Sequence, residues 1–559
     1  MPCQIDCLEP APLDPRAEQT MVPMRDGVRL ATDAYLPDRP GKLPAVLVRL
    51  PYDKCGRYTF MPQCAPFFND RGYVFVAQDV RGKFRSEGET IHAVHEVEDG
   101  YDTLEWIVTR PWSDGVVGMW GDSYYGYTQW AAVASGHPAL KAIVPRMTST
   151  DIGDCRHYWA DSVVHLFLAD YLAHYWIDRF IYDFPVDWNR RPLAQAFDEG
   201  FARIGRRSES LDRFVVQRGP GGFSPFPGEL HPYDCQRIPA LHSVGWFDNV
   251  APYSMQDYEA LCARPDRASL QYLIADATDH ENYHLRQFPL RPEDDHDTDD
   301  AALQRMLPSL TAPALDFFDV FLRGKGDPRG LPRVRWFLGH DDWHEAAQWP
   351  PPGARELRLY LAAPGRAVAG PEGGVLSRVP GSVKGLARWE HDPERLVPST
   401  LEDPASGIKD WPDERAIETR EDVLTFSSEP QSRKLDLVGP VTAFLRVGSS
   451  AESMHVMVKL LDVAPGGEAR VLVRGHAYAG SPDPERPVRI DLGHTGYRLD
   501  VGHSLRLHVA SSDFPMYLWH PGTAENPWLA TKGVVNQQLI STGGSAASYV
   551  GLSVMGDDD

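Results

Sequence analysis

The segment from 115 to 145, GVVGMWGDSYYGYTQWAAVASGHPALKAIVP, limits the possible folds of this chain more than any other stretch. An apolar run ends at Gly121, a tight turn holds Ser123, and a helical stretch rich in small residues leads to a second apolar run. Two buried strands joined by a helix form the repeating unit of a parallel sheet covered by helices. Such a turn lifts a serine hydroxyl above the carboxyl edge of the sheet, at the N-terminus of the next helix.

The turn itself leaves two interpretations of Ser123 open. The usual pattern of a nucleophilic serine, G-x-S-x-G, is not met as written, because Tyr125 stands at the place of the second glycine and Gly126 follows one residue later. A serine at this position also makes a good helix N-cap, since its hydroxyl accepts a hydrogen bond from the first helical turn. From the local segment alone, a nucleophile and a cap are equally well supported.

The same alternation of strands and helices extends to both sides of the serine turn. Short apolar runs predict buried strands, and an apolar stripe at helical spacing predicts the crossover helix that joins two of them. The predicted strands are 45–50, 73–79, 115–121, 240–248 and 270–276, and the predicted helices are 96–110 and 312–324.

Two further changes of pattern divide the chain. Residues 151–235 are dense in aromatic residues at helical spacing, and beyond about 335 short alternating segments are separated by Gly, Pro and Asp turns, which is typical of a β-sandwich. We therefore predict an α/β core over 1–150 and 236–335, a helical cap insertion over 151–235, and an all-β C-terminal sandwich over 336–559.

Composition and charge argue against several classes of function. The formal net charge of −22 and the lack of a basic run argue against nucleic acid as a partner. Seven scattered cysteines without a C-x-x-C pair favour free thiols, and the acidic stretch 293–300 lacks the glycine and spacing of a calcium loop. No segment approaches 18 uninterrupted apolar residues, and the first residues lack a secretion signal. We expect a soluble cytoplasmic protein with no membrane partner, metal or cofactor.

Partners for a nucleophilic serine follow in the required order. A catalytic triad of this fold needs an acid and then a histidine, each at the end of a later strand. Asp248 ends the apolar run 240–248, and His280 follows the run 270–276. Either residue alone is unremarkable, because Asp often forms turns and most histidines lie at the surface. Together and in this order they favour a nucleophile at Ser123.

These motifs resemble those of a known family of α/β-hydrolases, which includes cocaine esterase, glutaryl-7-aminocephalosporanic acid acylase, the α-amino acid ester hydrolases and, more distantly, the X-prolyl dipeptidyl aminopeptidases. The family's nucleophile motif, G-x-S-Y-x-G, is matched by Gly121, Ser123, Tyr124 and Gly126. Further matches are RLPYDK at 49–54, QDVRG at 78–82, SEG at 86–88 and GWFD at 245–248. The resemblance covers nearly the whole chain and implies a hydrolase core, a helical cap and a C-terminal jelly roll.

The resemblance also assigns roles to individual residues. Ser123 would be acylated, His280 would act as general base and acid, and Asp248 would orient the imidazole. The hydroxyl of Tyr52 and the backbone N–H of Tyr124 would hold the oxyanion. Trp159, in the cap, and Val250, after the acid, are the candidates for the walls of the acyl pocket.

The chain departs from the family pattern near its base, and several functions stay open. The family commonly has Gly-Pro-Trp-x-His before the base, whereas this chain has Asp276-Ala277-Thr278-Asp279-His280, and His284 is a second candidate for the base. The main hypothesis is hydrolysis of a small-molecule ester or amide. The alternatives are an acyltransferase or condensing enzyme, an X-Pro dipeptidyl peptidase, and a carbohydrate-binding or scaffold protein. The aromatic-rich cap is compatible with a homodimer.

Overall fold

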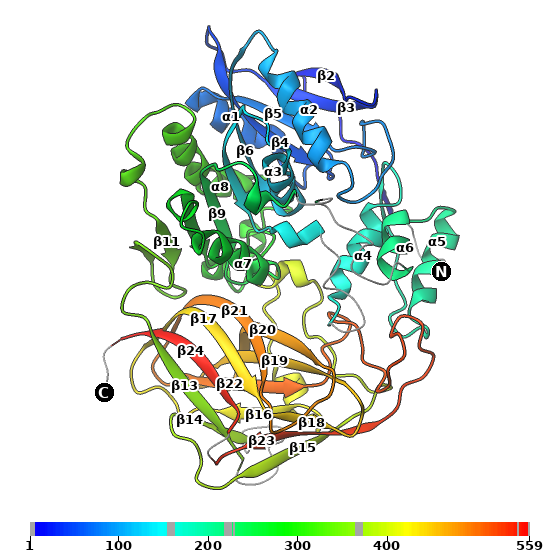
Figure 1. Cartoon of the computed structure of the whole chain (residues 1–559), viewed down its shortest axis with the longest axis vertical. Helices are drawn as coiled ribbons and strands as arrows, with labels where there is room; N and C mark the ends of the chain where they lie inside the picture. Colours follow the sequence, from blue (N-terminus) through cyan, green and yellow to red (C-terminus); the bar gives the residue numbers. More distant parts are fainter. Residues whose placement is uncertain are drawn as a thin grey trace.

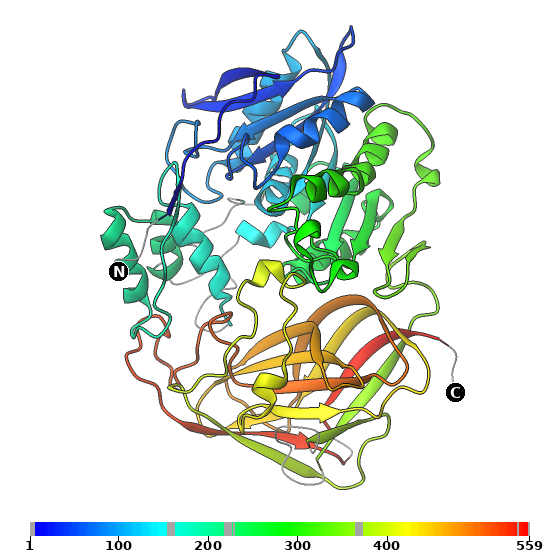
Figure 2. The same ribbon diagram turned by 180° about the vertical axis from the view of Figure 1, so that it is seen from behind.

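The computed structural model describes residues 6–153, 163–216, 226, 230–363, 373–544 and 547–556. In one half of the molecule, strands and helices alternate, and in the other half nearly all of the regular structure is β (Figure 1). The view from behind shows a group of helices beside the junction of the two halves (Figure 2). This arrangement confirms the predicted fold class of an α/β core with a β-rich C-terminal region.

The α/β half is built on one sheet that, among the described residues, has ten strands in the order β12-β11-β10-β9-β7-β6-β4-β5-β3-β2. The strands from β11 to β5 in this order run parallel, and β12, β3 and β2 are antiparallel to their neighbours. Their bounds are β2 (Ala17–Pro23), β3 (Arg29–Tyr35), β4 (Leu43–Leu50), β5 (Val74–Asp79), β6 (Ser113–Asp122), β7 (Leu140–Arg146), β9 (Ala240–Gly245), β10 (Gln271–Asp276), β11 (Val334–Phe337) and β12 (Trp343–Ala346).

Helices cover both faces of this sheet, as the crossover connections of parallel strands require (Figure 1). They are α1 (Met61–Arg71), α2 (Glu96–Val108), α3 (Ser123–Ser135), α7 (Ala251–Cys262) and α8 (Asp300–Phe321). All five predicted strands lie within or overlap observed ones, and the predicted helix 96–110 is α2. The prediction for 312–324 was too short at its start, because the Asp299 side chain caps α8 at the backbone N–H of Ala302 and the helix continues through Pro308 and Pro313.

The region predicted as a helical cap contains α4 (Leu166–Tyr175), α5 (Ala194–Ile204) and α6 (Glu209–Val216). It also holds a short strand, β8 (Ile181–Asp183), which pairs with β1 (Asp6–Leu8) near the start of the chain. The described part of the predicted cap region therefore contains helices and also the strand β8, which the aromatic pattern did not predict. The residue boundaries that we assign to the four parts of the chain stay predictions.

The C-terminal region contains, within the described residues, a nine-stranded sheet in the order β20-β19-β22-β16-β14-β13-β24-β17-β21 and a three-stranded sheet β15-β23-β18. Their bounds are β13 (Arg355–Ala362), β14 (Gly374–Ser377), β15 (Gly385–His391), β16 (Leu424–Ser427), β17 (Leu435–Leu445), β18 (Val447–Ser449), β19 (Met454–Val463), β20 (Ala469–Ala479), β21 (Val488–Leu499), β22 (Ser504–Ala510), β23 (Asn536–Thr542) and β24 (Tyr549–Met555). A shared apolar core joins this region to the α/β half, where the rings of Trp246 and Trp349 stack at 5.1 Å.

Across the described ranges, no helix is both long enough and apolar enough to cross a membrane. In the same part of the chain, no group of three or more His, Cys, Asp or Glu side chains is arranged to hold a metal ion.

Candidate active site

Ser123 lies at a strained turn between β6 and α3. Its φ angle is 50°, in the left-handed region that residues with a side chain rarely adopt. Both glycines of the motif are required by close packing. A Cβ atom at Gly121 would lie 2.1 Å from the Tyr125 ring, and one at Gly126 would lie 2.4 Å from the Thr148 methyl group. Tyr125 and Gly126, at which the segment departs from G-x-S-x-G, thus pack closely within the tight turn that holds Ser123.

Asp248 and His280 are brought together by neighbouring parallel strands. Asp248 follows β9 and His280 follows β10, and these strands pair in register up to Gly245 and Asp276. The Nδ1 atom of His280 lies 2.8 Å from Oδ1 of Asp248, and the same oxygen accepts the backbone N–H of Val250 at 2.9 Å. The Asp248 side chain is fully buried. Asp248 and His280, which the chain order indicated as partners, are therefore in contact.

Ser123 and His280 line one cavity of about 70 Å³. Burial alone would lower the pKa of the His280 imidazole, but the Asp248 carboxylate and, to a smaller extent, Glu281 and Asp122 raise it to about 9. The surroundings thus favour the protonated imidazolium. This is the charge state that a general base reaches after it has taken a proton from a nucleophile.

Tyr52 places a phenol beside the serine. Its hydroxyl interacts with the Ser123 side chain and the Tyr124 backbone, and lies 3.4 Å from the Tyr171 hydroxyl. Burial raises the pKa of Tyr52 to about 12, so the phenol keeps its proton and can donate it to a developing oxyanion. The backbone N–H of Tyr124 lies at the start of α3, where helix geometry leaves such groups without helical partners.

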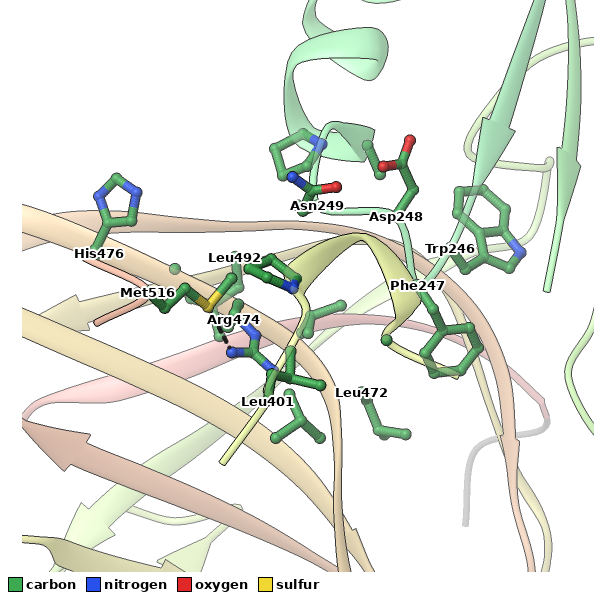
Figure 3. Close-up of a pocket in the computed structure, with 18 of the residues that line it drawn as sticks. Trp246, Phe247, Asp248, Asn249, Leu401, Leu472, Arg474, His476, Leu492 and Met516 are labelled. Carbon is green, nitrogen blue, oxygen red and sulfur yellow. Dashed lines mark hydrogen bonds between the residues drawn. The ribbon is translucent and has the colours of Figure 1, made fainter. Parts of the chain in front are cut away.

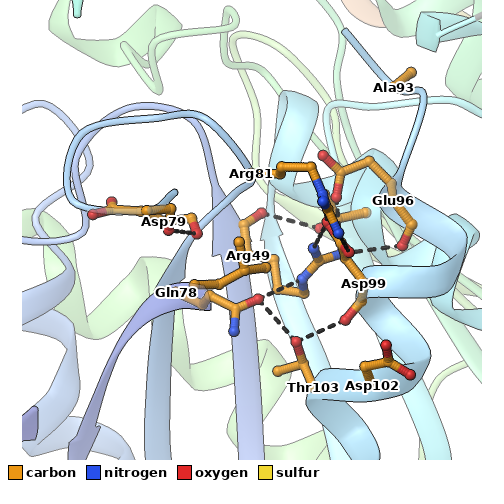
Figure 4. A network of polar contacts seen from close by, with 12 residues as sticks. Arg49, Gln78, Asp79, Arg81, Ala93, Glu96, Asp99, Asp102 and Thr103 are labelled. Atoms are coloured by element: carbon orange, nitrogen blue, oxygen red, sulfur yellow. Dashed lines mark hydrogen bonds and ion pairs between the residues drawn. The ribbon is translucent and has the colours of Figure 1, made fainter. Parts of the chain in front are cut away.

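The phenol of Tyr124 points away from the reaction into a buried polar network, part of which is drawn in Figure 4. Its hydroxyl donates to Oε1 of Glu96 at 2.8 Å, and Oε2 of Glu96 pairs with Arg49 at 2.8 Å. Arg49, which is 0% exposed, also donates to Gln78, while Arg81 pairs with Asp99 at 2.6 Å. This network therefore holds Tyr124, and with it the first turn of α3, in place.

A second set of contacts links the serine turn to the base loop. The Arg146 guanidinium donates to Oδ1 of Asp122 at 2.6 Å and to Oδ1 of Asn282 at 2.7 Å. The Asn282 amide in turn lies 3.3 Å from Oδ2 of Asp122. Asp122 precedes the serine and Asn282 lies two residues after His280. Arg146 therefore links the turn that holds Ser123 to the loop that holds His280.

The unusual approach to His280 has a structural explanation. Oδ2 of Asp279 accepts the backbone N–H groups of Ile408 at 2.9 Å and Lys409 at 3.3 Å, which come from the C-terminal region. Burial raises the pKa of Asp279 to about 8. Asp276 lies 3.1 Å from Nε2 of His284, and Nδ1 of His284 accepts a backbone N–H as a cap. Both carboxylates thus hold the loop in place, and His284 is not among the described residues of the Ser123 cavity.

The walls of the Ser123 cavity come from the cap, from α7 and the residues before it, and from the α/β core. Val250 lines it, as predicted, whereas Trp159 lies outside the described residues. The sequence did not indicate the remaining walls, because their contacts with Ser123 are tertiary and leave no local pattern. Among them are His92, Phe167, Leu168, Tyr171 and Tyr253.

Comparison with known proteins agrees with this geometry. Residues 26–178 match the X-Pro dipeptidyl-peptidase (S15 family), and residues 329–551 match the X-Pro dipeptidyl-peptidase C-terminal non-catalytic domain. Two solved structures share the fold over nearly the full length. An aminopeptidase from the marine sediment archaeon Thaumarchaeota archaeon has a TM-score of 0.79 at 23% identity, covering 97% of this chain and 96% of its own. An α-amino acid ester hydrolase has a TM-score of 0.76 at 24% identity, covering 96% of both chains.

A curated relative has higher sequence identity. The cocaine esterase of Rhodococcus sp. (strain MB1 Bresler) is 32% identical over 543 residues, which cover 90% of this chain and 91% of the relative. The full-length similarity and the two domain matches identify the family. The chain belongs to the cocaine esterase family of α/β-hydrolases and is a serine esterase.

Proposed function

We propose that the enzyme hydrolyses esters of small acyl groups through an acyl-enzyme on Ser123. In this proposal His280 is the general base and acid, Asp248 orients its imidazole, and Tyr52 and the N–H of Tyr124 bind the oxyanion. The observation that carries the proposal is the 2.8 Å contact of Asp248 with a histidine that shares one cavity with a serine at φ 50°.

The reaction has two halves. His280 takes the Ser123 proton while Oγ attacks the ester carbonyl, and the oxyanion accepts hydrogen bonds from Tyr52 and Tyr124. Each such donor contributes roughly 3–4 kcal/mol in the transition state. Collapse of the tetrahedral intermediate expels the alcohol, which receives the proton from His280. Water, deprotonated by His280, then attacks the acyl-enzyme and releases the acid with a free Ser123.

Two observations weaken the alternatives to ester hydrolysis. The residues before His280 differ from the family pattern and could favour an acyltransferase, but Asp276 and Asp279 bond to structural partners, the His284 side chain and the Ile408 backbone N–H. Asn249, Val250 and Ala251 follow the acid, so this position offers no carboxylate for the ammonium group of an amino-acyl or dipeptidyl substrate. Hydrolysis of an ester through acylation of Ser123 is the best supported reaction.

Covalent labelling tests this proposal. A fluorophosphonate should modify Ser123 and stop the hydrolysis of 4-nitrophenyl acetate, and Ser123→Ala should abolish both labelling and turnover. The matched control is Ser135→Ala at the far end of the same helix, where the hydroxyl bonds only to the Ala132 carbonyl, and it should behave as wild type. Full turnover by the Ser123→Ala protein would refute the assignment.

We further propose a reducing, cytoplasmic location, which free Cys7, Cys55, Cys64, Cys235 and Cys262 support. Thiol titration of the native and unfolded protein should therefore count these cysteines as reduced. The predicted homodimer stays a proposal, for which the molar mass in solution is the test.

A further inference from the structure

A second and larger cavity adjoins that of Ser123. It has a volume of about 260 Å³, against about 70 Å³ for the cavity at the serine. His165, Asn249 and Tyr253 line both, so the two spaces lie on either side of one layer of side chains. Small-molecule sites in proteins usually occupy about 300–1,000 Å³, which the smaller cavity alone does not approach.

The layer between the cavities contains polar atoms that lack partners. Within the part of the chain that the structure describes, Nε2 of His165 and Oδ1 of Asn249 are buried without a hydrogen-bond partner. His165 is only 8% exposed. A buried polar atom left without a partner costs about 1–3 kcal/mol, so a polar group of a ligand that reached these atoms would be stabilised.

The larger cavity, which we call the junction chamber, lies between the two halves of the molecule (Figure 3). Asn249 enters it from the loop after β9, whereas Arg474 and His476 come from β20 below. In this view the carboxyl group of Asp248 is turned away from Leu401 and Leu472, which lie at the opposite wall. The chamber therefore has both apolar and polar walls, and the Asp248 carboxylate contacts His280 and does not point into the chamber.

Charged groups that line the chamber lie near partners of opposite charge. Asp491 lies 3.6 Å from Arg489, and the His494 imidazole lies 3.3 Å from Glu259. Arg474 carries the one guanidinium or ammonium group among its described lining residues, and this group lies 3.3 Å from Oδ2 of Asp513. Asp513 also pairs with Lys459 at 3.0 Å. Burial lowers the pKa of His165 to about 3 and that of His476 to about 4, so both imidazoles are neutral near pH 7. A charged ligand group would lose its hydration here without gaining a free counter-charge.

The two parts of an ester make different demands on the space around the serine. The alcohol must leave before water can attack, so its side of the site needs an open route to solvent. The acyl group stays attached to Ser123 throughout and can occupy an enclosed space. His165, Asn249 and Tyr253 lie between Ser123 and the chamber, so the chamber can hold the far end of a group that stays bonded to the serine.

We propose that the junction chamber receives the far end of the acyl group, and that the enzyme prefers extended acyl groups ending in a neutral hydrogen-bonding group such as a hydroxyl. His165 and Asn249 supply the polar contacts at the passage between the two cavities. This inference rests on the proposed acylation of Ser123 and adds the class of acid that the ester contains.

A series of 4-nitrophenyl esters with one chain length tests the proposal. The acids are hexanoic acid, 6-hydroxyhexanoic acid, 6-aminohexanoic acid and adipic acid, whose far ends are methyl, hydroxyl, ammonium and carboxylate. The hydroxyl ester should have the highest kcat/KM, about tenfold above hexanoate, because it meets the unpartnered polar atoms. Equal values for methyl and hydroxyl, or a preference for a charged end, would overturn the proposal.

Variants locate the effect in the chamber. Leu401→Trp fills the chamber from its far wall and should leave 4-nitrophenyl acetate hydrolysis unchanged while lowering kcat/KM for the hydroxyhexanoate about tenfold or more. The control is Leu386→Trp on β15, where the side chain is 44% exposed, and it should have no effect. If Leu401→Trp does not fold, His476→Phe supplies a second change confined to the chamber. His165→Phe should abolish the preference for hydroxyl over methyl.

The outcomes separate this inference from the function on which it rests. Loss of acetate hydrolysis and of Ser123 labelling in the wild type would refute the esterase mechanism itself. Normal acetate hydrolysis with no response to Leu401→Trp would refute only the role of the chamber. A second series, in which the acyl group is acetyl and the alcohol is varied, should be insensitive to Leu401→Trp. Sensitivity in that series alone would assign the chamber to the alcohol and contradict our proposal.

Discussion

Two Asp–His pairs with nearly equal geometry occur in different regions of this molecule. In the α/β half, His280 Nδ1 lies 2.8 Å from Asp248, and in the β-rich region His503 Nδ1 lies 2.7 Å from Asp462. The first histidine shares a cavity with Ser123. The second has a side chain that is 25% exposed, and its aspartate also accepts the Tyr497 hydroxyl at 2.7 Å.

In our proposal only the first of these two Asp–His pairs serves catalysis, although the two contacts have nearly the same length. Parallel strands bring Asp248 and His280 to the edge of the sheet at which β6 presents Ser123, and the network behind Tyr124 fixes that turn. Antiparallel strands carry Asp462, whose carboxylate binds both His503 and the Tyr497 hydroxyl. We therefore base the proposed role of each Asp–His pair on its position in the fold.

The largest effect should come from the aspartates of the two pairs. Asp248→Asn should lower kcat/KM on the order of 10⁴-fold, because the amide favours the wrong imidazole tautomer and no longer stabilises the imidazolium. Asp462→Asn makes the same change, from carboxylate to amide, in the other pair and should leave kcat/KM within twofold of wild type. Steady-state hydrolysis of 4-nitrophenyl acetate measures both. Comparable losses in the two variants would remove the distinction that we draw between the pairs.

The next largest effect should come from the buried Arg49–Glu96 ion pair, which belongs to the polar network at Tyr124. Arg49→Met leaves the buried Glu96 carboxylate without its guanidinium and should lower the free energy of unfolding by about 3–5 kcal/mol. The control is Arg358→Met in the β-rich region, where both partners of the Arg358–Glu356 pair are about half exposed, and it should cost at most about 1 kcal/mol. Urea unfolding at pH 7 tests this prediction. A small loss for Arg49→Met would mean that the network does not anchor the serine turn.

A smaller effect is expected from the link at Arg146. Arg146→Met frees both the serine turn and the base loop and should lower kcat/KM about 10- to 100-fold. His280 acts as a base only when neutral, so kcat/KM should rise with pH through its raised pKa. Without Arg146, Asp122 is unpaired and raises that pKa further, so the midpoint should move to higher pH. Asp122→Asn should move it to lower pH. A midpoint that moves with neither substitution would contradict this coupling.

The smallest effect should distinguish the regions by their response to acid. Burial and the neighbouring His391 lower the pKa of His520, in the β-rich region, to about 4. Its unfolded form takes up a proton near pH 6.5 but the folded form does not, so its contribution to stability is complete above pH 6.5 and falls as the pH drops toward 4. His520→Asn should reduce the stability lost between pH 7 and pH 5 by about 1–2 kcal/mol. Urea unfolding at both pH values checks it, and an unchanged loss would count against a neutral buried His520.

The sequence predicted the parts of the site that depend on local pattern and chain order. Ser123 follows a buried strand, and Asp248 and His280 each come soon after later strands, so the shared edge of a parallel sheet brings them together. Tyr52 was found through the resemblance. Trp159 was named but lies outside the described residues, and its role in the pocket is untested.

Contacts between distant segments could not be predicted in this way. Asp279 departs from the family pattern, and the sequence does not reveal that it binds the backbone of Ile408 and Lys409, more than a hundred residues later in the chain. Likewise, the junction chamber requires the packing of α7 against β20 and β21, and no periodicity within any of these elements reports it.

The most direct test of the account is to trap the covalent intermediate. Wild-type enzyme mixed with excess 4-nitrophenyl hydroxyhexanoate and quenched in acid within the first turnover should show the acyl mass on the peptide that contains Ser123. The Asp462→Asn protein should show the same adduct, and the Ser123→Ala protein should show none. An adduct on another residue, or full turnover by the Ser123→Ala protein, would contradict the central claim that Ser123 is acylated.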